Sequence, residues 1–340
     1  MSFDPNAAAS PDSGAFGLPH SESEAHVVLI PVPFEATTSY GGGTVDGPEA
    51  IREASKQVDL FDIETGKPYE RGIHMLASPA AVRAWNDDAR ARASGIIANG
   101  GTGGDAALEK ELAQVNALCA QMNGWVHAES ERLIRAGKLV GLVGGDHSTP
   151  FGHIQAHAEA YPGMGILHLD AHADLRVAYE GFVWSHASIM HNVVARIPAV
   201  ARLVQVGIRD FCEEEHQQIV ESKGRIVTHF DAQLAAERQR GASWHQQLQK
   251  IVEPLPRNVY LSFDIDGLDP VLCPHTGTPV PGGLSFHEAT GLIRAVVESG
   301  RRIVGFDLNE VAPGPDDEWD GNVGARLLYK MIGWALKSTA

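Results

Sequence analysis

Short apolar runs recur along the chain and alternate with stretches in which apolar residues return at helical spacing. Each run has the length of a buried strand, and the runs begin at His26, Lys138, Gly165, Arg202, Arg225, Val259 and Arg302. The intervening stretches predict helices, most clearly over residues 106–136, 184–197, 244–252, 285–299 and 322–336. This alternation, with no interior stretch that resembles a linker, predicts a single α/β domain built on a parallel sheet.

Some segments stand outside this alternation. Residues 1–25 are rich in Ala, Ser, Pro and acidic residues without periodicity, so we expect a mobile N-terminal arm before one domain over residues 26–340. Residues 33–43 form a glycine-rich loop that lacks the Gly-Lys-Ser/Thr sequence of a phosphate-binding loop. Residues 78–105, rich in Ala, Arg and Gly, are expected to be a surface excursion.

Side chains that can bind a metal gather where the predicted strands end. In an extended chain alternate residues share one face, and in an α/β sheet ligands bind at the carboxyl ends of the strands. Some of these acids could instead be helix caps or turn formers, and Asp269 before Pro270 is expected to be a turn residue. The candidate metal ligands are His147, Asp170, His172, Asp174, Asp264 and Asp266.

The four carboxylates in this set carry more negative charge than one divalent ion normally needs. Carboxylate together with imidazole suits a borderline divalent ion better than Ca²⁺, which prefers oxygen ligands alone. Two ions about 3.5–4 Å apart, bridged by shared carboxylates and a hydroxide, would account for the whole set. The strand ends therefore predict a dinuclear metal centre.

Composition limits the kinds of partner and the cellular compartment that we expect for this protein. The 340 residues carry a formal net charge of −16, which argues against nucleic acid or an anionic membrane as a partner. The three cysteines, Cys119, Cys212 and Cys273, are scattered and form no CxxC pair, as is typical of a reducing compartment. No signal peptide is evident and no apolar run reaches the ~18 residues of a membrane span, so we expect a cytoplasmic protein.

Several motifs, in this order, resemble those of the ureohydrolases, the family of arginase and agmatinase. They are GGDHS, DAHAD, SFDIDGLDP, GTPVPGGLS and DLNEVAP, and the resemblance covers residues 26–338. It implies a three-layer α/β/α fold with a mostly parallel eight-stranded sheet, two divalent ions per chain (Ni²⁺ or Mn²⁺), and a trimer or hexamer of identical or related chains. One ion would be held by His147, Asp170, Asp174 and Asp264, and the other by His172, Asp170, Asp264 and Asp266.

The resemblance also implies which residues act on the substrate. A guanidinium is a planar, resonance-stabilised cation, so water barely attacks it unless a metal pair supplies hydroxide next to its carbon. A Glu holds this cation in the family, and Glu310 stands at the matching place. His186 resembles the family's proton-shuttling histidine, a role that suits a pKa near neutrality. With the bridging Asp170 and Asp264 they form the expected catalytic set, which would release urea, or a urea derivative, and ammonia or an amine.

Substrate choice depends on residues that depart from the family pattern. Residues 176–187 lack the Asn- and Ser-bearing segment with which arginases hold an amino-acid head group, which disfavours arginine. The aromatic residues Tyr179, Phe182 and Trp184 could narrow the pocket, and His275 stands where agmatinases more often have glycine. We therefore expect a small cationic guanidino substrate, such as guanidine, an alkylguanidine or the biguanide metformin, with Trp184 and His275 among its contacts. Agmatinase or guanidinobutyrase is the alternative.

Two rival classes stay open at the level of sequence. A phosphatase with a dinuclear centre would need basic phosphate-binding residues near the motifs, and none is evident. A non-catalytic subunit of a mixed oligomer should have lost metal ligands, whereas the whole set is present.

Overall fold

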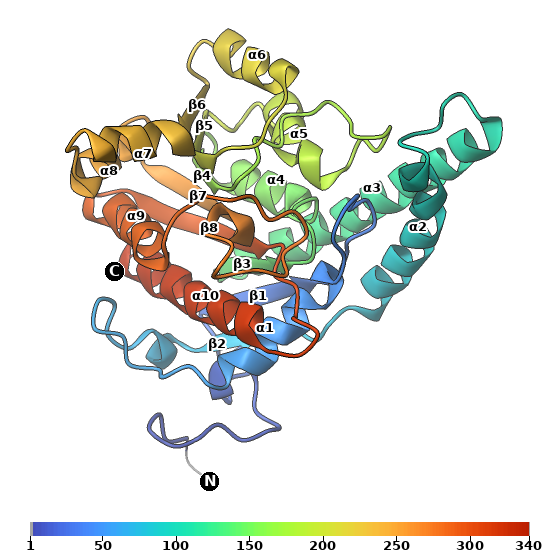
Figure 1. The fold of residues 1–340 in the computed structure, drawn as a ribbon. Coiled ribbons are helices and arrows are strands. Elements are labelled where there is room, and N and C mark those ends of the chain that lie inside the picture. Colours follow the sequence, from blue (N-terminus) through green and yellow to red (C-terminus); the bar gives the residue numbers. More distant parts are fainter. Residues whose placement is uncertain (1–2, 340) are drawn as a thin grey trace.

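Eight parallel strands form one sheet in the computed structural model, which describes residues 3–339 (Figure 1). Most strand residues are buried, which explains why the sequence shows continuous apolar runs rather than alternation. The spatial order is β2-β1-β3-β8-β7-β4-β5-β6. The strands are β1 (Val27–Val32), β2 (Ile73–Met75), β3 (Leu139–Gly144), β4 (Gly165–Leu169), β5 (Arg202–Ile208), β6 (Ile226–Phe230), β7 (Asn258–Asp264) and β8 (Arg302–Asn309).

Helices cover both faces of the sheet, so the three-layer α/β/α fold expected from the sequence is confirmed. One face is packed by α1 (Gly47–Ser55), α7 (Asp231–Gln239), α8 (Trp244–Val252), α9 (Phe286–Glu298) and α10 (Trp319–Lys337). The other is packed by α2 (Ala80–Ala98), α3 (Ala106–Arg135), α4 (Phe151–Ala160) and α5 (Ile189–Arg196). The remaining α6 (Glu213–Glu221) lies beside the edge strand β6. None of the helices among residues 3–339 combines the length and apolar character that crossing a membrane requires.

The prediction of a surface excursion over residues 78–105 is wrong for most of its length. That segment contains α2, whose Val82, Ala89 and Ala93 are fully buried in the core that α2 shares with α3. Two of the five buried residues of α2 are small alanines and a third is the polar Asn86, so the apolar periodicity of this helix is weak in the sequence. The short strand β2 and the helices α4, α6 and α7 also lie outside the predicted elements.

The segment before β1 lies against α1 and α10. Phe16 is buried, its backbone N–H donates to Ser55 Oγ at 2.8 Å, and its ring centroid lies 5.1 Å from that of Tyr329. Residues 3–14, by contrast, are mostly exposed. A mobile arm over residues 1–25 and a domain boundary at residue 26 stay predictions, and residues 1–2 lie outside the described part of the chain.

Candidate metal centre

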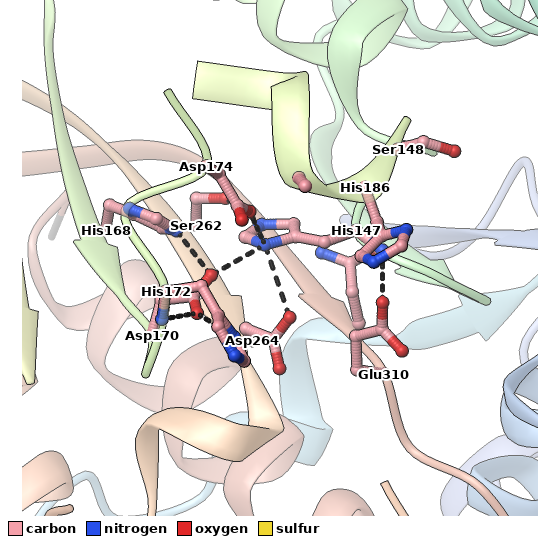
Figure 2. Close-up of polar contacts among 12 residues, drawn as sticks. His147, Ser148, His168, Asp170, His172, Asp174, His186, Ser262, Asp264 and Glu310 are labelled. Carbon is pink, nitrogen blue, oxygen red and sulfur yellow. Dashed lines mark hydrogen bonds and ion pairs between the residues drawn. The ribbon is translucent and has the colours of Figure 1, made fainter. Parts of the chain in front are cut away.

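The predicted ligands meet at the carboxyl ends of the central strands. β3, β8, β7 and β4 are neighbours in the middle of the sheet, and each continues into a loop that carries candidate site residues. Ligand sites of parallel α/β sheets form at this edge, because the strands end there together. All six predicted ligands lie in this one cluster. Figure 2 labels five of them, all except Asp266.

Two glycines bring the chain from β3 towards β4. A Cβ atom at Gly145 would collide with the backbone carbonyl of Phe34, so only glycine fits this close approach. A Cβ atom at Gly144 would collide with the side chains of Asn309 and Thr149. The loop therefore passes close to its neighbours and carries His147 across the ends of β8 and β7.

The ring of His147 is the centre of one half of the cluster. Its Nδ1 atom lies 3.0 Å from Asp170 Oδ2, 3.2 Å from Asp174 Oδ2 and 3.3 Å from Asp264 Oδ2. Its Nε2 atom lies 3.0 Å from Ser262 Oγ, which fixes the ring from behind. This group matches the first ligand set expected from the sequence.

His172 is the centre of the other half. Its Nδ1 atom lies 3.0 Å from Asp266 Oδ2 and 3.5 Å from Asp170 Oδ1. The Asp266 carboxylate is held in place by the backbone N–H of Ala171, which donates to Oδ1 at 3.0 Å. Asp170 touches both histidines and is placed as a bridging ligand would be.

The donor set fits a pair of divalent cations. Burial and the Asp170 carboxylate raise the pKa of Asp174 to about 7, and burial with the Asp266 and Asp170 carboxylates raises the pKa of Asp264 well above its usual range. Although burial acts in the opposite direction, hydrogen bonds to Asp170, Asp174 and Asp264 raise the pKa of His147. Crowded, buried carboxylates of this kind call for positive charge among them, and the mixture of imidazole and carboxylate suits borderline divalent metals.

Glu310 follows β8 and, within residues 3–339, has one carboxylate oxygen without a hydrogen-bond partner. Its Oε1 accepts the backbone N–H of His147 at 2.9 Å, whereas Oε2 is buried without a hydrogen-bond partner in the described chain. Burial and the Asp264 carboxylate raise the pKa of Glu310 well above its usual range. Glu310 and Asp174 both have left-handed backbone conformations, with φ of +63° and +55°. Such a conformation costs about 1–3 kcal/mol in a non-glycine residue and is common at functional sites.

His186 lines a cavity of about 160 Å³ that opens beside the cluster. Burial and the positive charges of His172 and His147 lower the pKa of His186 to about 3, so its ring is neutral at physiological pH. This value differs from the near-neutral pKa expected for a proton shuttle. The cavity is lined by Ser39, His172, Asp174, Arg176, Tyr179, His186, Ala187, Asp210, Phe211, Glu215 and Thr278.

Of the four residues predicted to contact substrate, His186 belongs to this cavity lining, whereas Glu310, Trp184 and His275 do not. Trp184 packs against Phe151, with ring centroids 4.9 Å apart, and the guanidinium of Arg196 lies 4.8 Å from its ring. His275 pairs with the buried Asp320, which accepts from His275 Nδ1 at 2.8 Å and from its backbone N–H at 3.0 Å. A direct substrate contact for Trp184 or His275 stays a prediction.

Sequence reasoning missed the residues that hold the ligands. His168 places its Nε2 atom 2.7 Å from Asp170 Oδ2. Ser262 joins His147 to Asp307, because its hydroxyl donates to Asp307 Oδ1 at 2.9 Å. His168 and Ser262 both lie on strands that end in ligands, two positions before Asp170 and Asp264 respectively, and this period-two spacing was the available signal.

The fold and this cluster together define a metal-dependent hydrolase that acts on carbon–nitrogen bonds. The chain belongs to the arginase family, whose family model matches residues 25–333. It is 34% identical to the N(1)-aminopropylagmatine ureohydrolase of Thermus thermophilus, over 91% of this chain and 90% of that protein. It is 30% identical to an agmatinase of Klebsiella pneumoniae, over 94% and 93% of the two chains. The proclavaminate amidino hydrolase of Streptomyces clavuligerus shares the fold, with a TM-score of 0.74, 22% identity and coverage of 98% and 100%.

Members of this family depend on a binuclear metal centre and are commonly oligomeric. The clustered histidines and carboxylates of this chain agree with that dependence. The chain is therefore an agmatinase-like ureohydrolase, and the resemblance stated from its motifs is confirmed.

Proposed function

We propose that the protein hydrolyses the guanidino group of a linear aminoalkylguanidine such as agmatine, releasing urea and an amine. The observation that carries this proposal is the free Oε2 atom of Glu310, a buried carboxylate oxygen without a hydrogen-bond partner among residues 3–339. A planar guanidinium is the natural partner for such an oxygen, because its N–H groups form charge-assisted hydrogen bonds with carboxylates.

The proposed ligands divide the chemistry among them. His147, Asp170, Asp174 and Asp264 would hold one ion, His172, Asp170, Asp264 and Asp266 the other, and we propose Mn²⁺ or Ni²⁺ as the metal. When bound, the two ions supply a nucleophile at neutral pH by lowering the pKa of water. The donor set itself suits either metal.

The residues of the chain would then position the substrate and move its protons. Glu310 holds the guanidinium with its carbon towards the metal cluster. His186, neutral and in the cavity lining, takes up the proton released when water adds to the guanidinium carbon and passes that proton to the departing amine nitrogen as the C–N bond breaks.

The cavity mouth supports a substrate with a positively charged tail. Glu215 is already engaged, since it accepts the backbone N–H groups of Leu175 and Cys212 at 2.9 and 2.8 Å. Asp210 also lines the cavity, and its carboxylate is exposed. We propose that Asp210 pairs with the distal ammonium of the substrate. The printed names of both relatives above, an agmatinase and an aminopropylagmatine ureohydrolase, agree with a cationic tail.

A small or branched guanidine is the second candidate. Tyr179 and Arg176 both line the cavity, and the Arg176 guanidinium lies 5.2 Å from the Tyr179 ring centroid. We propose that this pair restricts the width of the cavity. Free guanidine, an alkylguanidine or a biguanide such as metformin would avoid that constriction. Of the other two aromatic residues considered above, Phe182 is buried in the core and Trp184 packs against Phe151, which weakens the support for a narrow pocket.

Product analysis by mass spectrometry distinguishes the two candidates. Purified protein is loaded separately with Mn²⁺ or Ni²⁺ and incubated with agmatine, N(1)-aminopropylagmatine, guanidine, N-methylated guanidines, 4-guanidinobutyrate, arginine and metformin. Urea with putrescine or its aminopropyl derivative is the expected result. Turnover of guanidine or metformin alone would establish the second candidate. Phosphate esters belong in the same panel, because phosphate release would support the alternative that the protein is a phosphatase.

Two variants test the residues that carry the proposal. Glu310→Gln keeps the shape and one oxygen but removes the negative charge, so kcat/KM should fall about 10- to 200-fold, as for one hydrogen bond to a charged group worth ~1.5–3 kcal/mol. Asp210→Asn should lower kcat/KM for agmatine, mainly by raising KM. It should lower kcat/KM for guanidine less, because guanidine has no distal ammonium. An equal loss on both substrates would contradict the proposed role of Asp210.

We also propose a cytoplasmic location and an oligomer of trimeric or hexameric size. The three free cysteines support the location, and the family's common oligomerisation supports the oligomer. Light scattering on the purified chain, alone and with related chains, tests the oligomer and the alternative of a mixed assembly.

A further inference from the structure

We propose that Gln205, on β5, is a positioning residue for the metal centre. Its amide holds the ring of His168 against Asp170. The same amide also holds the backbone next to Asp174. Gln205 lies on a strand that supplies no predicted ligand, and nothing in its sequence context marks it. The inference rests on the ligand set of the proposed function, but it concerns metal affinity rather than substrate.

The side chain of Gln205 is fully buried and its amide is completely used. Its Nε2 atom lies 2.7 Å from the carbonyl oxygen of Ala173 and 3.1 Å from Nδ1 of His168. Its Oε1 atom accepts the hydroxyl of Thr228, on β6, at 2.9 Å. The amide thus links the neighbouring strands β4, β5 and β6 just below the cluster.

The orientation of the amide follows from its partners. A carbonyl oxygen can only accept, so the amide nitrogen, not the amide oxygen, must face Ala173. The second N–H of the same nitrogen then points to His168 Nδ1, which must accept. The remaining ring proton of His168 lies on Nε2, and it is donated to Asp170 Oδ2 at 2.7 Å. Gln205 therefore determines which nitrogen of His168 faces Asp170 as a donor.

The bond to Ala173 has a separate consequence. Asp174 is the next residue, and its left-handed conformation, with φ of +55°, turns its carboxylate towards His147. The Gln205 amide fixes the carbonyl of the peptide group immediately before that strained residue. One side chain thereby holds two ligands, Asp170 through a ring and Asp174 through the backbone.

Partners of this kind, which orient metal ligands without touching the metal, typically change metal affinity 10- to 100-fold when they are removed. Gln205→Glu retains size and shape but replaces the two donating N–H groups with an acceptor. It would place an oxygen against the Ala173 carbonyl and remove the constraint on the His168 ring. We expect a 10- to 100-fold loss of Mn²⁺ affinity in this variant.

The experiment measures metal binding directly, without substrate. Metal-free wild type and variants are titrated with Mn²⁺ against a chromophoric chelator, and the Co²⁺-loaded proteins are compared by visible absorption, which reports ligand geometry. Gln247→Glu is the matched control, because Gln247 on α8 is also buried and donates to a backbone carbonyl, that of Leu234, at 2.9 Å. The control should bind Mn²⁺ with wild-type affinity and show the wild-type Co²⁺ spectrum.

A folded Gln205→Glu variant with wild-type affinity and an unchanged Co²⁺ spectrum would overturn the inference. If this variant does not fold, Gln205→Asn takes its place and the same criterion applies. Its side chain is shorter by one methylene, so the amide no longer reaches the same partners and no charge is added. Rescue is part of the test, because Gln205→His retains a donor and should lose less affinity than Gln205→Glu. If the wild type binds metal and hydrolyses agmatine while the variant binds metal equally well, this inference alone is refuted. Wild type that binds no metal would refute the proposed function as well.

Discussion

The dependence of stability on acid pH provides a quantitative test of the burial of His157. This residue lies on the face of the sheet opposite α10. His157, on α4, is fully buried. Its Nδ1 donates to the carbonyl oxygen of His153 at 2.8 Å, while Nε2 has no partner among residues 3–339. Because a carbonyl only accepts, Nδ1 carries the proton and the ring is neutral. Burial lowers the pKa of His157 from 6.5 to about 4.

The sign and size of the effect follow from these two values. Above pH 6.5 the ring is neutral in both states and contributes no pH dependence. As the pH falls from 6.5 towards 4 the unfolded chain binds a proton that the folded chain refuses, so the free energy of unfolding decreases. A difference of about 2.5 pKa units corresponds to a loss of about 3 kcal/mol across this window.

Denaturant unfolding of the metal-free protein between about pH 4 and pH 7.5 measures this loss. The His157→Leu variant lacks the titrating ring, so the difference in unfolding free energy between wild type and variant should shift by about 3 kcal/mol in favour of the variant as the pH falls. His287→Leu, at an exposed position on α9, controls for the removal of a histidine as such. Parallel pH profiles for wild type and His157→Leu would refute the reasoning, since they would mean that the buried ring becomes protonated without penalty.

Three further outcomes are expected. Gly145→Ala should abolish stoichiometric Mn²⁺ binding, measured by equilibrium dialysis, because the added Cβ would collide with the Phe34 carbonyl, whereas Gly124→Ala on α3 meets open space and should bind normally. Chelation of the metals should lower the melting temperature, since bound ligand at 1,000 times its Kd stabilises by about 4 kcal/mol; equal melting curves with and without chelator would contradict the metal centre. Asp320→Asn should weaken the clamp on His275, so KM should rise more than kcat falls in steady-state assays.

The sequence was most informative where a short apolar run is followed directly by residues that can bind a metal. The apolar runs before His147, Asp170 and Asp264 predicted three central strands and the residues at their ends, and the capped helix from Ser285 was found close to its bounds. Such signals are local, because period and composition are carried by neighbouring residues.

The features that the sequence did not reveal depend on contacts between distant segments. The buried face of α2 includes two alanines and an asparagine, whose burial depends on α3 lying close by. Strand β2 is too short to give a pattern. The roles of His168 and Gln205 depend on the pairing of β4 with β5, which places their side chains together. Neither residue can be distinguished by type from an ordinary buried polar residue.

The strand order also has a consequence for when the site can form during synthesis. β3 and β4 follow one another closely along the chain but lie three strand spacings apart, roughly 14 Å, because β8 and β7 insert between them. A nascent chain that ends before β7 therefore has His147 and Asp170 but lacks the strands that hold them at the correct separation. Metal capture should therefore wait until β8 (Arg302–Asn309) has left the ribosome, so an occupied centre reports that the four central strands β3, β8, β7 and β4 have paired.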